Sequence, residues 1–534
     1  PEVYFRSNCK ILVMCKIQYF VIMLFGLCLL CGCEDALTVK PENSLTYENG
    51  LSTPKDFESF INGVDKALKV LTYTNEPNLQ IKKGVYVDDY YDDSEMEWSQ
   101  TLSFPSSELS YWNTRSWQIY YQPIANANVV LAYADVADLS SEERNLYKGQ
   151  AWFYKALLYL EIIRQWGDCM LIRDQVELLP TAKTNWDEVA DYAIDLATKA
   201  AEVLPEFDKI RMANGNVATY KSTPCKGSAN ALLAHLCAWK AGGKYFAHDD
   251  AYDEMELWKK AEEACTRVIT SGQYGLAANP EEVCASVLLG DSRESIYETI
   301  TRNFWNEERL PMGPKHIVED YAGWPIIPTI QPSSVAYNVC RIKASSMKEM
   351  YLQNDLRREA YFYKLDSMSH DTLLPVTGGY AYLYKFRKFY TERTDDGYIM
   401  VRGLDQNKIW WRLADIYLLR AECRARLGGN YMEGAIDDLN KIRERANAKL
   451  YDASEYGGDL RYAIFKEREK ELLLEGQRYY DIIRNDYVRM ELKGNYQTVT
   501  NQDLKDGALF LMIGDGAFSQ NPLLRQNTYW HRRL

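Results

Sequence analysis

The sequence predicts a mainly α-helical protein built from stacked helix pairs, into which irregular loops and short strands are inserted. Three observations lead to this prediction. Apolar and small residues recur at helical spacing over long segments, and glycine or proline follows most of these segments. Two regions rich in tyrosine and polar residues, near 75–112 and 298–403, lack the helical period. With 534 residues, the chain is long enough for one large core.

The N-terminal segment has the pattern of a lipoprotein signal peptide. An uncharged run from Tyr19 to Leu30 follows Lys16, and it is too short to span a bilayer comfortably. The sequence Leu30-Cys31-Gly32-Cys33 then has the form of a bacterial lipobox. We therefore expect residues 1–32 to be the signal peptide, Cys33 to carry lipid, and 33–534 to form a single domain. The alternative is that the apolar run is a buried N-terminal helix.

Composition excludes several classes of function. A net charge of −13 argues against nucleic acid as a partner, because phosphate contacts require a basic surface. The cysteines after Cys33 are scattered and odd in number, so we interpret them as buried apolar residues and not as disulfides or zinc ligands. These cysteines are Cys169, Cys225, Cys237, Cys265, Cys284, Cys340 and Cys423. The five histidines are isolated in sequence, and neither a metal nor another cofactor is expected.

The clearest helix pair lies near the C-terminal third of the chain. From Trp410 to Leu427, apolar and small residues follow one helix face, and Gly428-Gly429 then ends the helix. A second helix follows, with Ala435, Leu439 and Ile442 on one face. This pair resembles a tetratricopeptide unit, in which each pair must stack on another to bury its apolar face.

Other segments show the same pattern less regularly. They are Thr114 to Asp135, Tyr147 to Trp166, Trp186 to Leu204, Ser228 to Ala241, Glu256 to Thr270, and Ala463 to Asn485. Gly242-Gly243 is interpreted as the turn that ends one of these helices, and not as a phosphate-binding loop. A stacked scaffold of this kind is usually a platform for binding.

The order of motifs along the chain resembles the SusD/RagB family of outer-membrane lipoproteins from the Bacteroidetes. The N-terminal motifs are Asp35, Leu37 and Pro41, then Trp117, Tyr121, Ile124 and Asn128, and the aromatic helix that closes on Trp166-Gly167-Asp168. The C-terminal motifs are the helix Arg412 to Glu422, then Leu439, Asn440 and Arg443, then Glu467, Arg468, Glu471, Leu472, Glu475, Gly476, Arg478, Asp481 and Arg484, and finally Asn521-Pro522 and Gln526-Asn527. Asn485 and Thr528 depart from the family pattern.

The resemblance implies a fold, a cellular location and a function. Such proteins sit on the outer face of the outer membrane as the lid of a SusC-like TonB-dependent barrel transporter. They capture a nutrient, most often a glycan, and they are not enzymes. The chain is therefore expected to be a lipid-anchored surface protein with a glycan ligand and a barrel partner.

Aromatic residues in the two irregular regions are the candidate ligand contacts. A sugar ring has an apolar C–H face that a flat side chain covers, while neighbouring polar groups bind its hydroxyls. In the family, glycan contacts come from these two regions. The candidates are Tyr90, Tyr91, Trp98, Tyr111, Trp112, Trp305, Tyr321 and Trp324. Trp410 and Tyr417, which follow the helical stripes, are assigned to the core.

The charged residues of the C-terminal signature suggest an ion-pair network more strongly than a catalytic site. Arg412, Asp415, Glu422 and the acidic and basic positions from Glu467 to Asp481 fall at spacings that allow pairing within and between helices. The acidic stretch 88–95 is interpreted as a solvated loop, since it lacks the spacing of a calcium loop.

Three alternatives to glycan capture remain at this point. The same fold could bind peptides or another non-glycan nutrient. A periplasmic helical scaffold could bind a partner protein. A lipid-anchored glycosidase would need two facing carboxylates about 5–10 Å apart, and no sequence feature identifies such a pair.

Overall fold

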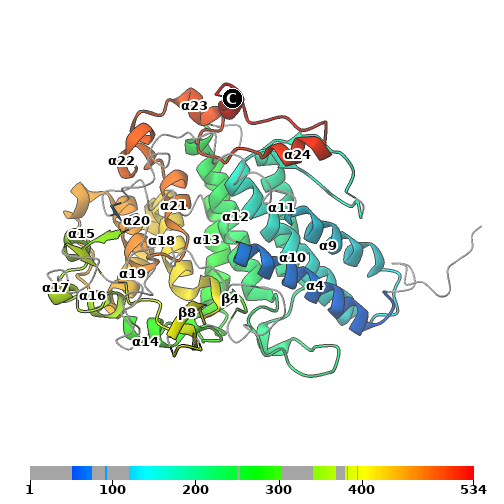
Figure 1. Cartoon of the computed structure of the whole chain (residues 1–534), viewed down its shortest axis with the longest axis horizontal. Helices are drawn as coiled ribbons and strands as arrows, with labels where there is room; N and C mark the ends of the chain where they lie inside the picture. Colours follow the sequence, from blue (N-terminus) through cyan, green and yellow to red (C-terminus); the bar gives the residue numbers. More distant parts are fainter. Residues whose placement is uncertain are drawn as a thin grey trace, which may run out of the picture. The chain divides into compact units, whose positions relative to one another are not determined.

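Long α-helices form most of the computed structural model, which describes residues 51–74, 91–92, 119–176, 178–248, 253–301, 341–368, 379–381, 383–393, 395–397 and 399–533. The long helices are α4 (Pro54–Thr74), α9 (Tyr121–Tyr133), α10 (Ser141–Trp166), α11 (Trp186–Val203), α12 (Lys226–Phe246), α13 (Glu254–Thr270), α18 (Leu413–Leu427), α19 (Met432–Arg445) and α20 (Leu460–Glu471). Helices α10, α11, α12, α13, α18 and α19 pack one against the next in that order. Figure 1 shows α12 and α13, in green, lying side by side. The prediction of a mainly helical fold of stacked pairs is confirmed.

Shorter elements complete the described part of the chain. The short helices are α14 (Pro280–Ala285), α15 (Ala344–Met350), α16 (Arg357–Tyr361), α17 (Leu365–Met368), α21 (Arg478–Arg484), α22 (Val488–Glu491), α23 (Asn501–Lys505), α24 (Asp515–Gln520) and α25 (Thr528–His531). The 3-10 turns are η2 (Phe207–Lys209), η3 (Val287–Leu289), η6 (Gly429–Tyr431), η7 (Glu455–Gly458) and η8 (Gly494–Thr498). The strands are β1 (Tyr91–Asp92), β2 (Cys169–Met170), β3 (Lys183–Thr184), β4 (Ser295–Thr299), β5 (Arg341–Lys343), β6 (Tyr380–Ala381), β7 (Phe389–Arg393), β8 (Ile399–Leu404) and β9 (Lys408–Arg412).

Local sequence sets the ends of the main helices. The Ser140 hydroxyl accepts a hydrogen bond from the Glu143 backbone N–H at 3.2 Å, and the Glu143 carboxylate accepts one from the Ser140 N–H at 2.9 Å. This reciprocal cap starts α10. Gly167, with φ of 70°, ends it in a conformation that favours glycine.

Helix α12 corrects the prediction that Gly242-Gly243 forms a turn. The helix runs through both glycines to Phe246, and the two are buried. A Cβ atom on Gly242 would lie 2.5 Å from Cγ of Arg484 and 3.0 Å from its Cα. Glycine is therefore needed at 242 because α21 approaches α12 closely there.

The predicted helix from Ala463 to Asn485 is two helices, α20 and α21. The chain turns between them, where Leu474 and Gly476 have φ of 59° and 88°. The turn buries Leu473 and Leu474 against other elements, and this burial outweighs the helical pattern.

The helix predicted to start at Trp410 starts at Leu413, because residues 408–412 form strand β9. Strand β9 pairs antiparallel with β4, so that Trp411 lies opposite Tyr297. Trp410 is buried, as predicted, and donates from Nε1 to the Thr299 hydroxyl at 2.8 Å. Tyr417 is only half-buried and packs at the edge of the core between α18, α19 and α20.

The six cysteines that the structure describes after Cys33 are buried and free, which confirms their interpretation as apolar residues; Cys340 lies outside the described residues. Within the described ranges, no helix has the length and apolar character that a membrane crossing requires.

Candidate binding site

The two inserted regions meet in a small antiparallel sheet with strand order β1-β5-β6. Tyr91 of the first region lies opposite Ile342 of the second, and Asp92 lies opposite Arg341. Ile342 in turn lies opposite Ala381. Paired antiparallel residues have Cα atoms about 4.5–5.5 Å apart, so the backbones of the two regions are in direct contact.

Among the predicted ligand contacts, the structure describes the backbone of Tyr91 only. Tyr91 lies in β1, at the junction of the two regions. The other seven candidates lie outside the described residues: Tyr90, Trp98, Tyr111, Trp112, Trp305, Tyr321 and Trp324. The lipidation candidate Cys33 and most of the acidic stretch 88–95 also lie outside them.

Beneath β5 and β6 lies an apolar cluster that joins the second inserted region to the helical body. From that region it includes Ile342, Met347 and Phe362, each fully buried. Leu473 and Leu474, from the turn between α20 and α21, pack into the same cluster. The turn that interrupts the predicted long helix therefore supports the inserted region.

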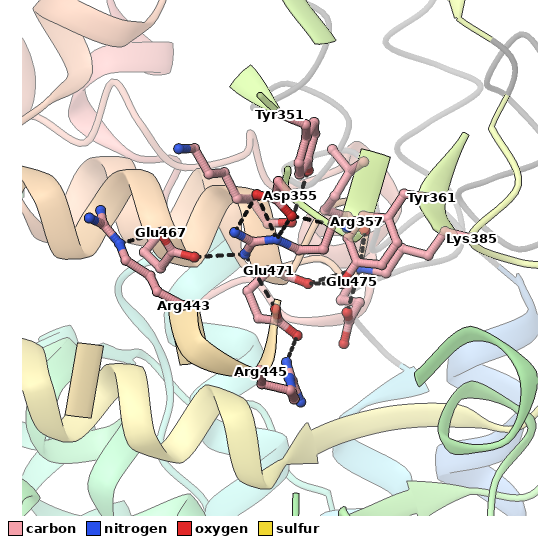
Figure 2. A network of polar contacts seen from close by, with 12 residues as sticks. Tyr351, Asp355, Arg357, Tyr361, Lys385, Arg443, Arg445, Glu467, Glu471 and Glu475 are labelled. Carbon is pink, nitrogen blue, oxygen red and sulfur yellow. Dashed lines mark hydrogen bonds and ion pairs between the residues drawn. The ribbon is translucent and has the colours of Figure 1, made fainter. Parts of the chain in front are cut away.

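A buried network of charges fixes the same junction (Figure 2). We call it the clamp and define it by five basic and five acidic residues. They are Arg357, Lys385, Arg412, Arg443 and Arg445, with Glu294, Asp355, Glu467, Glu471 and Glu475.

Glu471, at the end of α20, is the centre of the clamp and is fully buried. Its carboxylate accepts from Nη1 of Arg412 at 2.8 Å and from Nη1 of Arg357 at 3.4 Å, and it also accepts from Arg445. Its carbonyl oxygen accepts from Nζ of Lys385 at 3.1 Å. One residue of the body therefore binds two residues of the inserted region, Arg357 and Lys385.

The remaining clamp contacts reach the strands and the neighbouring helix. Arg357 also binds Asp355 and Glu467, at 2.8 and 2.7 Å. Arg412, at the end of β9, holds Glu475 with two N–H groups at 2.7 and 2.8 Å. Paired hydrogen bonds from a planar guanidinium fix orientation as well as distance.

The clamp keeps Glu471 and Glu475 ionised. Burial opposes ionisation of Glu471, but the charges of Arg445, Arg412 and Arg357 outweigh it and hold the pKa well below its usual range. The pKa of Glu475 is lowered in the same way, against burial, by Arg412 and Lys385. A carboxylate held in this state is a poor general acid, so these two do not form the acid–base pair that glycoside hydrolysis needs.

A second buried network crosses the helical stack. Asp415 of α18 binds Nε2 of His235 and Nη2 of Arg468, each at 2.8 Å. Arg468 and Arg484 both bind Asp481, at 2.9 and 2.6 Å. The sequence prediction that the signature charges pair between helices is confirmed by both networks.

Sequence reasoning did not identify several of the partners. Arg357, Lys385, Arg445 and Glu294 are essential to the clamp but were not singled out. Each has other charged residues near it in sequence, and no local spacing connects it to α20.

Comparison with known proteins supplies the family. The model of the SusD family matches residues 295–530, and a second model, described as starch-binding and associating with the outer membrane, matches residues 36–236. The chain belongs to the SusD family. Two SusD-like proteins of Formosa agariphila are each 24% identical to it, over 516 and 555 residues. The alignments cover 88% and 96% of this chain, and 90% and 98% of the relatives.

Solved SusD structures share the fold. A SusD homologue from Bacteroides thetaiotaomicron has a TM-score of 0.71 and 22% identity, covering 90% of this chain and 98% of its own. Surface glycan-binding protein A from the same organism, in complex with laminarihexaose, has a TM-score of 0.63 and 17% identity. That match covers 90% of this chain and all of the other. At these identities the likeness establishes the SusD fold.

Proposed function

We propose that this SusD family member captures a glycan at the cell surface and passes it to a SusC-like TonB-dependent barrel transporter in the outer membrane. The observation that carries the proposal is the β1-β5-β6 sheet, which joins two aromatic-rich inserted regions next to the buried clamp. Lipid on Cys33 would hold the protein at the membrane, and the chain would act by binding and not by catalysis.

The joined regions suit an aromatic binding arc. Strands β1 and β5 pair at Tyr91 and Ile342. The chain segment that follows β1 and the segment that precedes β5 are therefore joined at this pair, and both contain tryptophans. Trp98 is seven positions after Tyr91, and Trp324 precedes β5. Aromatic side chains on two such segments provide flat faces for sugar rings, and the matched family model carries the description starch-binding.

A binding screen tests the proposal. The protein from Glu34 onward would be run through gels that contain one polysaccharide each. We expect one glycan to retard it, and Trp98→Ala or Trp324→Ala to abolish the retardation. Tyr220→Ala is the matched control, because Tyr220 is 54% exposed and lies outside both inserted regions. Retardation that survives both tryptophan changes would contradict the proposed site.

The second candidate is uptake of peptides or another non-glycan nutrient by the same fold. It would be favoured if no polysaccharide retards the protein while a peptide library yields a ligand whose binding depends on Trp98 or Trp324.

The lipid anchor at Cys33 is tested separately. Cys33→Ser should move the protein in cells from the membrane fraction to the soluble fraction, and an unchanged distribution would contradict lipidation.

A further inference from the structure

A polar pocket lies beside the clamp, and the clamp residues Asp355, Arg443 and Glu467 form part of its lining. Its volume is about 570 Å³. Side chains from α15, from the end of α19, from η7 and from α20 line it, and none of these comes from strands β1, β5 or β6. Nothing in the proposed function uses this pocket.

The acidic residues of the pocket floor are already neutralised. Glu467 binds Arg357 at 2.7 Å and Arg443 at 2.8 Å. Asp355 binds Arg357 at 2.8 Å, and Glu455 binds Arg443 at 2.8 Å. Of the four carboxylates that line the pocket, the exposed Glu349 alone has no ion pair with a described residue.

Two lysines in the pocket, the exposed Lys449 and the half-buried Lys470, have no ion pair with a carboxylate of the described residues. Lys470 lines the pocket from α20, and no carboxylate of the described residues lies within ion-pairing distance of its ammonium group. Its backbone is fixed, because the Tyr351 hydroxyl donates to its carbonyl oxygen at 2.9 Å. Burial lowers the pKa of Lys470, although Glu467 opposes this effect. An anionic ligand group would supply the half-buried ammonium group of Lys470 with an ion-pair partner.

An aromatic ring stands at the rim. Tyr456 is 42% exposed and has φ of 51° and ψ of 36°, the left-handed conformation that a bulky residue rarely adopts. Its ring meets Tyr462 edge to face at 4.9 Å between centroids, which fixes its plane. Strain of this kind in a residue with an exposed ring is typical of functional positions.

Polar groups suited to hydroxyls complete the rim. Asn447 also has a left-handed backbone, with φ of 50°, and its amide donates to the Asn354 carbonyl at 3.1 Å. The exposed side chains of Asn354 and Glu349 line the pocket beside it. A flat ring, two lysine ammonium groups and several amide or carboxylate groups together match a sugar that carries an acid group.

We propose that this pocket is a second glycan-binding site, which takes a uronate, with Lys470 binding the sugar carboxylate and Tyr456 covering the C–H face of the ring. The inference rests on the proposed function only for the class of ligand. It predicts that uronate binding does not depend on the aromatic residues of the inserted regions.

Calorimetric titration with two matched probes tests the site. The probes are trigalacturonate and its methyl ester, which keeps the rings but removes the charge. We expect the protein from Glu34 onward to bind trigalacturonate at least fivefold more tightly than the ester. Lys470→Met should remove this difference, and Lys470→Arg should retain most of it. Tyr456→Asn should weaken the binding of both ligands, and asparagine tolerates the left-handed backbone at this position.

Controls separate this inference from the proposed function. Lys505→Met changes an exposed lysine of α23 and should leave both affinities unchanged. Trp98→Ala with Trp324→Ala should also leave trigalacturonate binding intact. If that double variant abolishes it while Lys470→Met does not, the uronate binds the inserted regions, and the second site is wrong while the proposed function stands. Absence of trigalacturonate binding to the unmodified protein, or equally tight binding of triglutamate, would also overturn the second site.

Discussion

Replacing Glu471 with glutamine tests whether the clamp holds the second inserted region to the helical body. The substitution keeps the shape of the side chain but removes the charge that three guanidinium groups share. An amide oxygen can accept from two of these donors at most, and its NH₂ group presents a donor to the third. Removing one partner of a buried ion pair costs about 3–5 kcal/mol, because the opposite charge stays buried.

We expect Glu471→Gln to lower the free energy of unfolding by about 3–5 kcal/mol at pH 7, a large share of the 5–15 kcal/mol typical of a folded domain. The fold lowers the pKa of Glu471, so its stabilisation is present above the usual glutamate pKa of about 4.3. It is lost as the pH falls through the lower folded-state value. The difference between variant and unmodified protein should therefore shrink in acid.

Urea unfolding followed by tryptophan fluorescence and circular dichroism measures the effect, and coincident transitions would justify a two-state treatment. Amide hydrogen exchange shows which part of the protein is destabilised. We expect faster exchange in residues 344–368 and unchanged exchange in α12. Glu188→Gln is the matched control, since Glu188 is 58% exposed and pairs with Arg173 at the surface. Such pairs contribute at most about 1 kcal/mol. Equal effects of the two substitutions, or exchange that increases first in α12, would refute the reasoning.

Two further substitutions test other parts of the fold. Gly242→Ala should destabilise by about 1–3 kcal/mol in the same urea titration, because its Cβ would lie 2.5 Å from Cγ of Arg484. Gly63→Ala, where nothing lies within 4 Å, should instead stabilise α4 by about 0.5–1 kcal/mol, and the same sign for both would contradict the close-approach argument. Burial raises the pKa of Asp65 to about 6, against the hydrogen bond from Tyr154, so unmodified protein loses stability as the pH rises from about 4 to 6. Asp65→Asn should therefore melt at a higher temperature than unmodified protein at pH 7.5 and at an equal temperature below pH 4, and a difference that does not change with pH would contradict this assignment.

The helical stack could be predicted because its signal is local. Ala414, Leu418 and Ala421 recur at helical spacing in the sequence, and all three are fully buried in α18. Stacking follows from such stripes, since a helix pair cannot bury its apolar face alone. The pairing of the signature charges could also be predicted, because their spacing places them on helix faces that meet.

Other features depend on contacts between distant parts of the chain. The Gly242-Gly243 pair has the sequence of a helix end, yet α12 continues through it, and the approach of α21 explains why glycine is needed at 242. Trp410 fits the helical stripe of α18, yet pairing with β4 draws it into a strand. Apart from the local pair between Arg357 and Asp355, the partners of Arg357 and Lys385 lie on α20 and in the turn after it, and no sequence pattern indicates them.

For the candidate ligand contacts too, the sequence predicts some features and leaves others undetermined. Their assignment to two regions follows from composition and from the SusD/RagB resemblance, and the β1-β5 pairing at Tyr91 gives the regions a common anchor. Which tryptophans face a ligand depends on loop geometry that residue spacing does not encode, so their roles stay predictions that the binding screen decides.

The position of the clamp explains how so small a sheet can anchor two long inserted regions. Strands β1, β5 and β6 contribute only two or three residues each, and a sheet of that size is not stable alone in water. The apolar cluster beneath the sheet holds the second inserted region against the helical body. It fixes the orientation of that region only weakly, because apolar contacts have no preferred direction. The guanidinium groups of Arg357 and Arg412 supply that direction through hydrogen bonds of fixed geometry to Glu471 and Glu475. Buried charge at this junction therefore serves to position the inserted regions, and a change at Glu471 should disturb them before it disturbs the helical stack.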